Sequence, residues 1–319
     1  MATESELIAA LSEIFQQLPD ENLIIDIGDD GAVFESVGKI VAVADMSVED
    51  IHFKREWSSL SQIGAKITAA NLADIFAMGG EPTYLLITAG LPRGFSVEEM
   101  HELALGIHSE AQLVGARVIG GDLSTAEKIT ISITVLGRVV KPITRSGARV
   151  GQRLVVSGLP GWSAAGYSVL TTPNPLGQTS AAEQAIASHL KPMVQYQRAR
   201  EMAVAGVSSM IDISDGLLSE AGHLCRASAV GLVVDAQKLS QLPDFARLKE
   251  LALNIDGNHW EWILAGGEDH LFLATIDSER SLPDGVFEIG ETVAKIGVQV
   301  SGLEGLGGIY NGTGYRHFG

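Results

Sequence analysis

Cysteine is almost absent from this chain of 319 residues, which contains only Cys225. A single thiol cannot form an internal disulfide, so we expect the protein to act in a reducing compartment, the cytoplasm. Cys225 starts no metal-ligand pair, and we interpret it as a small core residue. No apolar run is long enough to span a bilayer, and the acidic N-terminal stretch lacks the basic region of a secretory signal. The sequence therefore predicts a cytoplasmic protein with no membrane partner.

Positive charge is also scarce, because 22 Lys and Arg stand against 39 Asp and Glu, a formal net charge of −17. A chain this acidic repels the phosphate backbone, so we expect no nucleic-acid partner. If the protein binds phosphate esters, another source must supply positive charge, and divalent metal ions are the obvious candidate. Aromatic residues amount to 6% and hydrophobic residues to 46%. The apolar mass is therefore Ala, Val, Ile and Leu, which is typical of α/β and α+β folds.

Several catalytic motifs are missing as well. The sequence has no GxxxxGK[ST], which excludes a P-loop nucleotide site. Its eight histidines form neither HExxH nor a paired zinc spacing, and neither Ser157 nor Ser163 lies in a GxSxG turn. Zinc chemistry and triad hydrolysis are therefore disfavoured.

The hydrophobic pattern predicts two α+β domains, 1–142 and 143–319, separated at the basic, turn-rich stretch KPITRSGARVGQ. Strict βαβ alternation is missing, which favours α+β over a doubly wound sheet. Helices are predicted at 4–18, from Leu60 to about 78, at 96–115, 161–170, 180–190, 193–205 and 217–228. Strands are predicted at 41–45, 83–91, 117–122, 128–139, 154–158, 209–212, 231–235, 270–275 and 286–292.

Aspartates recur where strands and turns are predicted to end. These are Asp30 in GDDGA, Asp45 in VAVAD, Asp74 in ANLADIFAMGG, Asp122 in VIGGD, and Asp212 and Asp215 in IDISDG. An ionised carboxylate among apolar and small residues is costly unless it is paired or bound to metal, and basic residues are too few to pair most of them. Magnesium takes oxygen ligands and bridges carboxylates to phosphates. The set therefore indicates a magnesium–nucleotide site.

Each aspartate also has an ordinary structural explanation, and the residues alone leave it open. Asp30 can be a turn residue, Asp45 a plain strand end, and Asp74 a solvated position on a helix face. Ser214 and Asp215 can cap the helix that follows them. Capping and ligation are compatible, since a helix N-terminus also favours phosphate.

Taken in order, several motifs resemble the thiamine-monophosphate kinase family, from residue 24 to the C-terminal GYRHF. They are GDDGAVF, ADMSVEDIHF, NLADIFAMGGEP, IGGD, TRSGARVGQ, IDISDGLLSEAGHL and LAGGEDHLFL. The resemblance implies the fold of aminoimidazole ribotide synthetase, with two α+β domains and the N-terminal domains of a homodimer sharing a β-barrel. It also implies transfer of the γ-phosphate of ATP onto thiamine monophosphate. Because the acceptor oxygen is already anionic, we expect direct in-line transfer with several magnesium ions and no strong general base.

The same resemblance gives roles to individual residues. The magnesium ligands it implies are Asp30, the main chain of Ala44, Asp45, Asp74, Asp122, Asp212 and Asp215. The ATP contacts are Gly121, Asp122, Arg145 and Ser214, and the contacts to thiamine monophosphate are His52 and Glu268. Tyr315, or alternatively Tyr310, is expected to take the place of the family's aromatic residue in the thiamine pocket. Asp74 and Arg145 are expected to be catalytic, and the planar guanidinium of Arg145 suits phosphate oxygens.

The sequence departs from the family pattern in three motifs. Val43 and Ala44 stand where Ser or Thr usually precedes the aspartate, His270 follows GGED where Tyr is common, and Gly312 replaces an aromatic residue. The alternatives are an inactive magnesium–nucleotide-binding protein, or another ATP-using enzyme of the superfamily, such as selenophosphate synthetase or a hydrogenase-maturation dehydratase. Those enzymes tend to carry a reactive cysteine near the N-terminus or in the C-terminal tail, and Cys225 lies at neither place.

Overall fold

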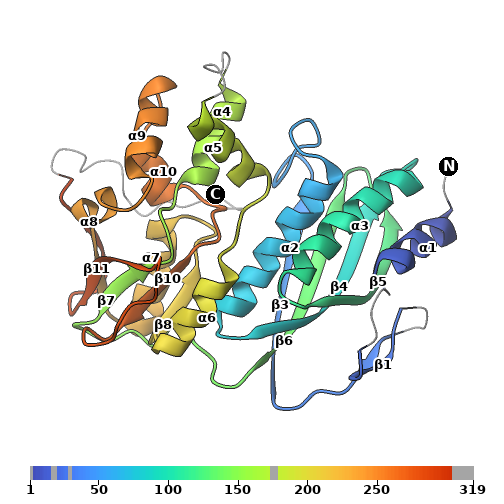
Figure 1. The fold of residues 1–319 in the computed structure, drawn as a ribbon, viewed down its shortest axis with the longest axis horizontal. Helices are drawn as coiled ribbons and strands as arrows, with labels where there is room; N and C mark the ends of the chain where they lie inside the picture. Colours follow the sequence, from blue (N-terminus) through green and yellow to red (C-terminus); the bar gives the residue numbers. More distant parts are fainter. Residues whose placement is uncertain (1–2, 16–19, 28–30, 173–178, 304–319) are drawn as a thin grey trace. The chain divides into compact units, whose positions relative to one another are not determined.

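The computed structural model describes residues 3–15, 20–27, 31–172 and 179–303 (Figure 1). The chain divides into two compact units, the first made of Met1–Phe76 and Gly80–Lys141, the second of Ala77–Gly79 and Pro142–Gly319. Both units combine helices and sheets, which confirms a two-domain fold of mixed secondary structure. In the part of the chain that is described, no helix has the length and apolar character needed to cross a membrane.

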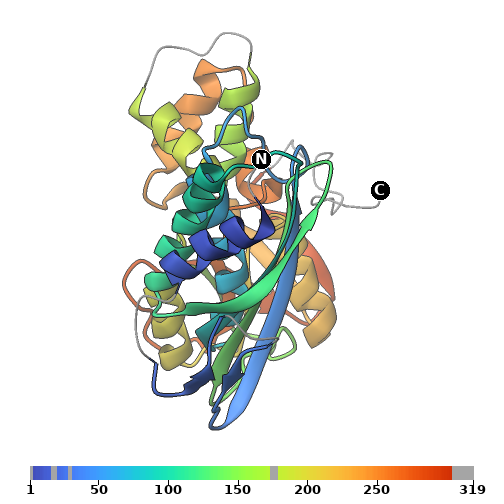
Figure 2. The same ribbon diagram turned by 90° about the vertical axis from the view of Figure 1, so that its right-hand side faces the viewer.

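The first unit is built on a four-stranded sheet in the order β3-β6-β4-β5. Its strands are β3 (Lys39–Val48), β6 (Thr130–Val139), β4 (Glu81–Leu91) and β5 (Arg117–Thr125), and only the β4–β5 pair is parallel. Helices α2 (Leu60–Ala77) and α3 (Val97–Gln112) lie on one face, and α1 (Glu4–Phe15) packs on α3 (Figure 2). Strands β1 (Leu23–Ile25) and β2 (Val33–Phe34) form a separate antiparallel pair.

Alternation along β6 explains which face of this sheet carries the helices. Ile131, Ile133 and Val135 are all 0% exposed, while the residues between them are only partly buried. This is the pattern of a strand with one buried face. The helices on that face approach each other closely at Gly106, where an added Cβ would lie 2.0 Å from the Ser61 carbonyl oxygen. Glycine is therefore required for α2 and α3 to pack at this distance.

The opposite face of the same sheet is lined by exposed apolar side chains. Ile40, Met46 and Leu86 are 50%, 57% and 37% exposed. Strand register pairs them with Arg138, Ser132 and Thr134, the β6 positions that alternate with the buried ones. Among the described residues this sheet is open and does not close into a barrel.

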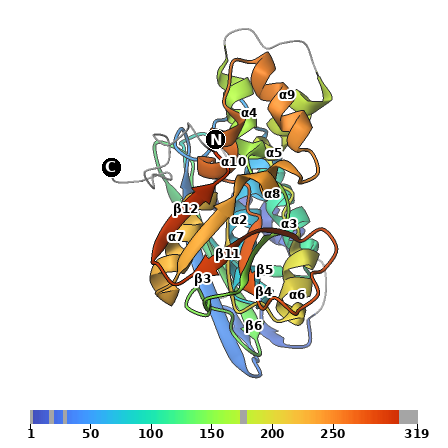
Figure 3. The same cartoon turned by 90° about the vertical axis from the view of Figure 1, so that its left-hand side faces the viewer.

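The second unit contains a six-stranded sheet in the order β12-β9-β11-β7-β10-β8, in which only β12 and β9 are parallel (Figure 3). Its strands are β7 (Arg153–Val156), β8 (Ser209–Asp212), β9 (Gly231–Asp235), β10 (Phe272–Ile276), β11 (Phe287–Val293) and β12 (Gly297–Ser301). Its helices are α4 (Trp162–Thr171), α5 (Ser180–Leu190), α6 (Tyr196–Ala205), α7 (Leu217–Ser228), α8 (Ala236–Ser240), α9 (Phe245–Asn254) and α10 (His259–Ala265). The core joins the central strands to α4, α7, α9 and α10.

Two strands that were expected to end at aspartates continue beyond them. β3 extends past Asp45 to Val48, and β5 extends past Asp122 to Thr125. The reason is that both ladders go on, with Val48 opposite Thr130 on β6 and β5 still paired to β4, so the main-chain groups remain bonded. Asp45 and Asp122 are also exposed rather than embedded in apolar surroundings. Asp212 does end its strand and is 3% exposed, as the sequence indicated.

Candidate active site

In the second unit, the turn between β8 and α7 carries three of the predicted site residues. β8 ends at Asp212, and the chain then passes through Ser214 and Asp215 to the start of α7. The helix N-cap is Gly216, with a φ of 104° and no side-chain cap bond. An added Cβ at Gly216 would lie 2.7 Å from the Ala265 carbonyl oxygen, so only glycine fits. The N-cap position of α7 is thus Gly216 rather than Ser214 or Asp215.

Glu220, on the first turns of α7, is a candidate site residue that was not predicted from the sequence. It is 3% exposed, and its Oε1 accepts a hydrogen bond of 3.3 Å from the Asp215 main-chain N–H. Burial is the largest cause that raises the pKa of Glu220 to about 7, and the negative charges of Asp212 and Asp215 act in the same direction. The hydrogen bond from the Asp215 main chain and the positive charge of Arg145 oppose them. The signal was present in the sequence, because Glu220 occupies the apolar stripe of α7 formed by Leu217, Ala221 and Leu224.

Arg145 lies beside the same helix. Its carbonyl oxygen accepts a 2.8 Å hydrogen bond from the Ser228 hydroxyl. Its positive charge acts on Glu220, and it also contributes to the lowered pKa of His223, which is caused first by burial and then by Arg226. Arg145, Asp212 and Asp215 thus all lie close enough to Glu220, within one unit, for their charges to act on it.

The loop after α10 stacks on the turn after β8. The main-chain N–H of Glu268 donates to the Ser214 carbonyl at 2.7 Å, and that of His270 donates to the Ile213 carbonyl at 3.0 Å. An added Cβ at Gly267 would lie 2.4 Å from the same Ser214 oxygen, which explains the glycine before Glu268. Glu268 and His270 have φ values of 63° and 50°, in the left-handed region that non-glycine residues seldom adopt. The loop is therefore held in a defined conformation by its neighbours.

Two further contacts fix this loop from its side chains. His270 Nδ1 lies 3.1 Å from Asp212 Oδ2, so the residue that replaces the family's tyrosine holds a predicted magnesium ligand. The Asp269 carboxylate accepts hydrogen bonds from the main-chain N–H groups of Gly161 at 2.6 Å and Ser163 at 3.0 Å. Burial raises the pKa of Asp269 to about 6, even though those two bonds favour its charged form. The loop is thereby attached both to β8 and to the start of α4.

In the first unit, α2 is tied to β3 at Asp45. The side-chain oxygen of Asn71 accepts a 3.0 Å hydrogen bond from the Asp45 main-chain N–H, and its amide donates to the Ile67 carbonyl at 2.9 Å. Asn71 is fully buried, and Asp74 follows it by one helical turn in a half-buried position. The bond therefore fixes the helix register that sets Asp74 relative to Asp45.

Gly121 and Asp122 lie across the same sheet from Asp45. Register pairs Asp45 with Ile133, Ile133 with Ile87, and Ile87 with Gly121, so these residues form one row across four strands. Three strand spacings separate the ends of the row by about 14 Å. An added Cβ at Gly121 would lie 1.8 Å from the Ile87 carbonyl oxygen, so no other residue fits there.

His52 lies in the turn that follows β3. Its Nδ1 accepts a 3.0 Å hydrogen bond from the Val48 main-chain N–H, and its own N–H donates to the Val48 carbonyl at 3.0 Å. These bonds fix the ring against the end of the strand. Asp30, Tyr315 and Gly312 lie outside the described residues.

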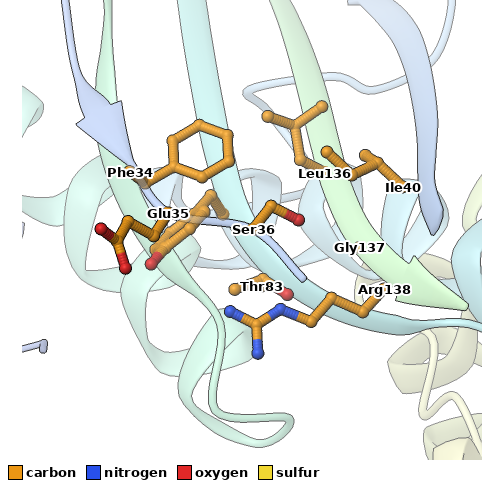
Figure 4. A pocket seen from close by; sticks show the side chains of 9 residues that line it. Phe34, Glu35, Ser36, Ile40, Thr83, Leu136, Gly137 and Arg138 are labelled. Carbon is orange, nitrogen blue, oxygen red and sulfur yellow. The ribbon is translucent and has the colours of Figure 1, made fainter. Parts of the chain in front are cut away.

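Clusters of metal-ligating side chains and pockets are two further features that can mark a binding site. Within the described ranges no group of three or more His, Cys, Asp and Glu side chains is close enough to hold a metal ion by itself. A pocket in the first unit is lined by Phe34, Glu35, Ser36, Ile40, Thr83, Tyr84, Leu136, Gly137 and Arg138 (Figure 4). It lies on the open face of the sheet, and its lining includes none of the predicted site residues.

Comparison with known proteins places the chain in a family. Residues 28–139 match the AIR synthase related protein N-terminal domain, and residues 149–301 match the corresponding C-terminal domain. The chain is 34% identical over 284 residues to a thiamine-monophosphate kinase of Mycobacterium tuberculosis, covering 86% of this chain and 83% of the relative. The chain belongs to the thiamine-monophosphate kinase family of AIR synthase related proteins. The Bacillus subtilis family member is 35% identical over 264 residues, covering 80% of this chain and 78% of its own length.

Solved structures of the thiamine-monophosphate kinase family have the same fold. AaThiL complexed with AMPPCP and TMP matches with a TM-score of 0.81 and 30% identity, covering 100% of this chain and 99% of its own. The enzyme from Stenotrophomonas maltophilia matches with a TM-score of 0.80 and 26% identity, covering 94% of this chain and 97% of its own. The Escherichia coli hydrogenase maturation protein HypE, at 17% identity and a TM-score of 0.70 with 95% of each chain covered, shares the fold alone.

Proposed function

We propose that this protein is a thiamine-monophosphate kinase, which transfers the γ-phosphate of ATP to thiamine monophosphate and releases thiamine diphosphate and ADP. The observation that carries the proposal is the match over the whole chain to AaThiL, which binds AMPPCP and TMP. AMPPCP is an ATP analogue, so that protein accommodates both a nucleotide and a phosphate acceptor. The grouping of Asp212, Asp215 and Arg145 around α7 supports the same activity here.

The reaction requires the protein to align the two substrates and to neutralise the charge of their phosphate groups. The acceptor is a phosphate monoester whose oxygen is anionic near neutral pH, so no strong general base is needed. We propose a single in-line displacement, in which the acceptor oxygen forms the new P–O bond as the bond to ADP breaks. Arg145 would pair with phosphate oxygens through its planar fork, and Asp74 would act through bound cations.

The acidic residues fit divalent cations. Glu220 has a pKa raised first by burial and then by the negative charge of Asp212, so carboxylates gather around the start of α7, and carboxylate oxygens are the donors that magnesium prefers. Asp45 and Asp122 are exposed, so a cation can reach their carboxylates. When bound, magnesium ions stabilise the charge of the transferring phosphoryl group. We assign them to Asp30, the Ala44 main chain, Asp45, Asp74, Asp122, Asp212 and Asp215.

The substrate contacts follow from the family-matched positions. We assign ATP to Gly121, Asp122, Arg145 and Ser214, where Gly121 lets the β4 and β5 backbones pack without a side chain. We assign thiamine monophosphate to His52, Glu268 and Tyr315. The fixed ring of His52 and the constrained backbone of Glu268 suit recognition, because neither must be ordered when substrate binds.

We further propose a homodimer in which residues 1–142 form the dimerisation and nucleotide domain and residues 143–319 the second domain. Exposed Ile40, Met46 and Leu86 support this arrangement, since apolar side chains gathered on one face of a sheet favour burial against a second sheet. Two such sheets meeting through these faces would form the β-barrel implied by the family. The single, buried Cys225 is in keeping with action in the reducing cytoplasm.

Phosphorus NMR of the protein with magnesium, ATP and thiamine monophosphate tests the activity. We expect the β-phosphate signal of thiamine diphosphate to grow together with that of ADP. Asp215→Asn should slow both, whereas Asp244→Asn, an exposed aspartate paired with Arg247 on α9, should not. Consumption of ATP without thiamine diphosphate would indicate another enzyme of the superfamily. Binding of ATP without consumption would indicate an inactive nucleotide-binding protein.

A further inference from the structure

Glu268 contacts a buried histidine, which in turn contacts a buried serine from another helix. His189 Nδ1, in the last turn of α5, lies 3.4 Å from Glu268 Oε2 and 3.1 Å from the Ser163 hydroxyl oxygen, at the start of α4. His189 is 9% exposed and Ser163 1%, whereas the Glu268 side chain is 35% exposed. The partly exposed Glu268 carboxylate thus contacts the buried His189, and His189 contacts the buried Ser163 hydroxyl.

Close packing of α4 against α5 fixes the place of His189. An added Cβ at Gly166 would lie 2.0 Å from the Ala185 carbonyl oxygen and 2.8 Å from His189 Cβ, so the helices can approach this closely only at glycine. The Tyr167 ring meets the His189 ring edge-on, with centroids 5.7 Å apart. Rotation of the imidazole is therefore restricted on two sides.

The chemistry of the contact determines which ring nitrogen of His189 carries the proton. A carboxylate only accepts hydrogen bonds, so an attractive contact with Glu268 requires His189 Nδ1 to carry a proton. The Ser163 hydroxyl oxygen can accept from the same N–H and thereby hold the ring in this orientation. The N–H of His189 is then a donor of fixed position, which orients the Glu268 carboxylate.

Ser163 also connects the two neighbouring carboxylates. Its main-chain N–H donates to Asp269 at 3.0 Å, while its hydroxyl faces the His189 ring that contacts Glu268. The backbone between these carboxylates is in the left-handed region at Glu268. One residue at the start of α4 thus fixes the loop by its backbone and the direction of Glu268 by its side chain.

We propose that His189, with Ser163 behind it, is a positioning residue that orients Glu268 toward the acceptor substrate. This inference rests on the proposed function, in which Glu268 contacts thiamine monophosphate. The acceptor carries a cationic thiazolium ring, and a fixed carboxylate attracts a cation without first losing conformational freedom. His189 touches neither substrate in this scheme and acts through Glu268.

Steady-state kinetics on four variants tests the proposal. His189→Leu should raise KM for thiamine monophosphate about tenfold and leave KM for ATP unchanged, because it removes one charge-assisted contact. His189→Asn, whose amide can place an N–H near the Nδ1 position, should recover most of the loss. Glu268→Gln should raise the same KM, and adding His189→Leu to it should have little further effect. His101→Leu, an exposed histidine on α3, is the matched control.

The outcomes separate this inference from the proposed function. If Glu268→Gln raises KM for thiamine monophosphate but His189→Leu does not, the positioning role is wrong and the function stands. Equal damage from His189→Leu and His189→Asn would make His189 a packing residue only. Wild-type protein that does not phosphorylate thiamine monophosphate would overturn both. Nitrogen NMR of labelled histidine gives a readout apart from activity: His189 should be protonated at Nδ1, with a shift that changes in Glu268→Gln.

Discussion

His270 Nδ1 and Asp212 Oδ2 lie 3.1 Å apart, and their side chains are only 8% and 4% exposed. The contact joins the loop after α10 to the end of β8, where Asp212 is the proposed magnesium ligand. The histidine thus provides Asp212 with a partner inside the protein.

Removing that partner should destabilise the second unit. His270→Leu leaves the Asp212 carboxylate buried with one contact fewer, and we expect a loss of about 2 kcal/mol. Thermal melts in chelator, read by tryptophan fluorescence, measure the change. His101→Leu is the control for a lost histidine on the surface. An unchanged melting temperature would show that the 3.1 Å contact contributes nothing to the fold.

Glu220 should make stability depend on pH in the metal-free protein. Its pKa is raised from 4.5 to about 7, so the native state binds a proton more tightly than the unfolded chain does. Stability from this group is therefore intact below pH 4.5 and falls as the pH rises toward 7. Glu220→Gln removes the cost of ionising a buried carboxyl group. It should therefore stabilise the protein at pH 8 by up to about 3 kcal/mol but have little effect at pH 4.5. Melts in chelator across this range measure the difference, and a gain that does not depend on pH would contradict the assignment.

Asp74 should matter for turnover rather than for folding. Asp74→Asn keeps the shape and removes the charge, and metal-held stabilisation of the transition state is worth several kcal/mol, so turnover should fall about a hundredfold or more. The melting temperature in chelator should be unchanged or higher, because the substitution removes the desolvation cost of a half-buried charge. Near-normal turnover at limiting magnesium would refute the ligand role. Asp284→Asn, an exposed aspartate of the second unit, is the control.

Two adjacent glycines on β5 should respond differently to the same substitution. An added Cβ at Gly121 would meet the Ile87 carbonyl oxygen at 1.8 Å, which forces the β4 and β5 backbones apart. At Gly120 the nearest atom is Leu86 Cδ2 at 3.2 Å, the end of a side chain that can move. We expect Gly121→Ala to weaken ATP binding and lower stability by about 2 kcal/mol or more, and Gly120→Ala to be mild. Titration with a fluorescent ATP analogue and thermal melts give both values.

The open face of the first sheet should set the oligomeric state. Met46→Glu places a charge among the exposed apolar side chains of that face and should convert a dimer to a monomer at micromolar concentration. Light scattering coupled to gel filtration measures this. Val204→Glu, at an 88% exposed position on α6, should leave the mass unchanged. Wild-type protein that runs as a monomer with full activity would refute the dimer.

Element positions with a strong periodic signal were predictable from the sequence. The helix expected at 217–228 is α7, and the strands expected at 83–91 and 128–139 are β4 and β6. Their boundaries follow from glycine stops and from alternation of apolar residues. By contrast, α8, α9, α10 and β12 were not predicted. These elements are short or mixed in character, and packing on the rest of the unit stabilises them more than their own sequence does.

The sequence proposes a set of candidate site residues but not how they are arranged. Asp212, Asp215 and Arg145 were identified from motifs, and the structure gathers them around α7. Glu220 was missed because nothing in its local sequence shows that the face of α7 it shares is turned toward two aspartates. His189 was missed because its contact with Glu268 depends on the packing of α4 against α5.

The sequence by itself determined the chemistry available to this protein: a surplus of carboxylates, few cations, one cysteine and a set of motifs in family order. These follow from residue types and local spacing, which need no folded structure to be read. The tertiary structure alone decided which charges face one another and which are buried. Asp45 and Asp122 lie inside strands with exposed carboxylates, while Asp212, Glu220 and His270 are buried. The reason is that burial and electrostatic coupling depend on contacts between segments far apart in the chain, which local sequence does not specify.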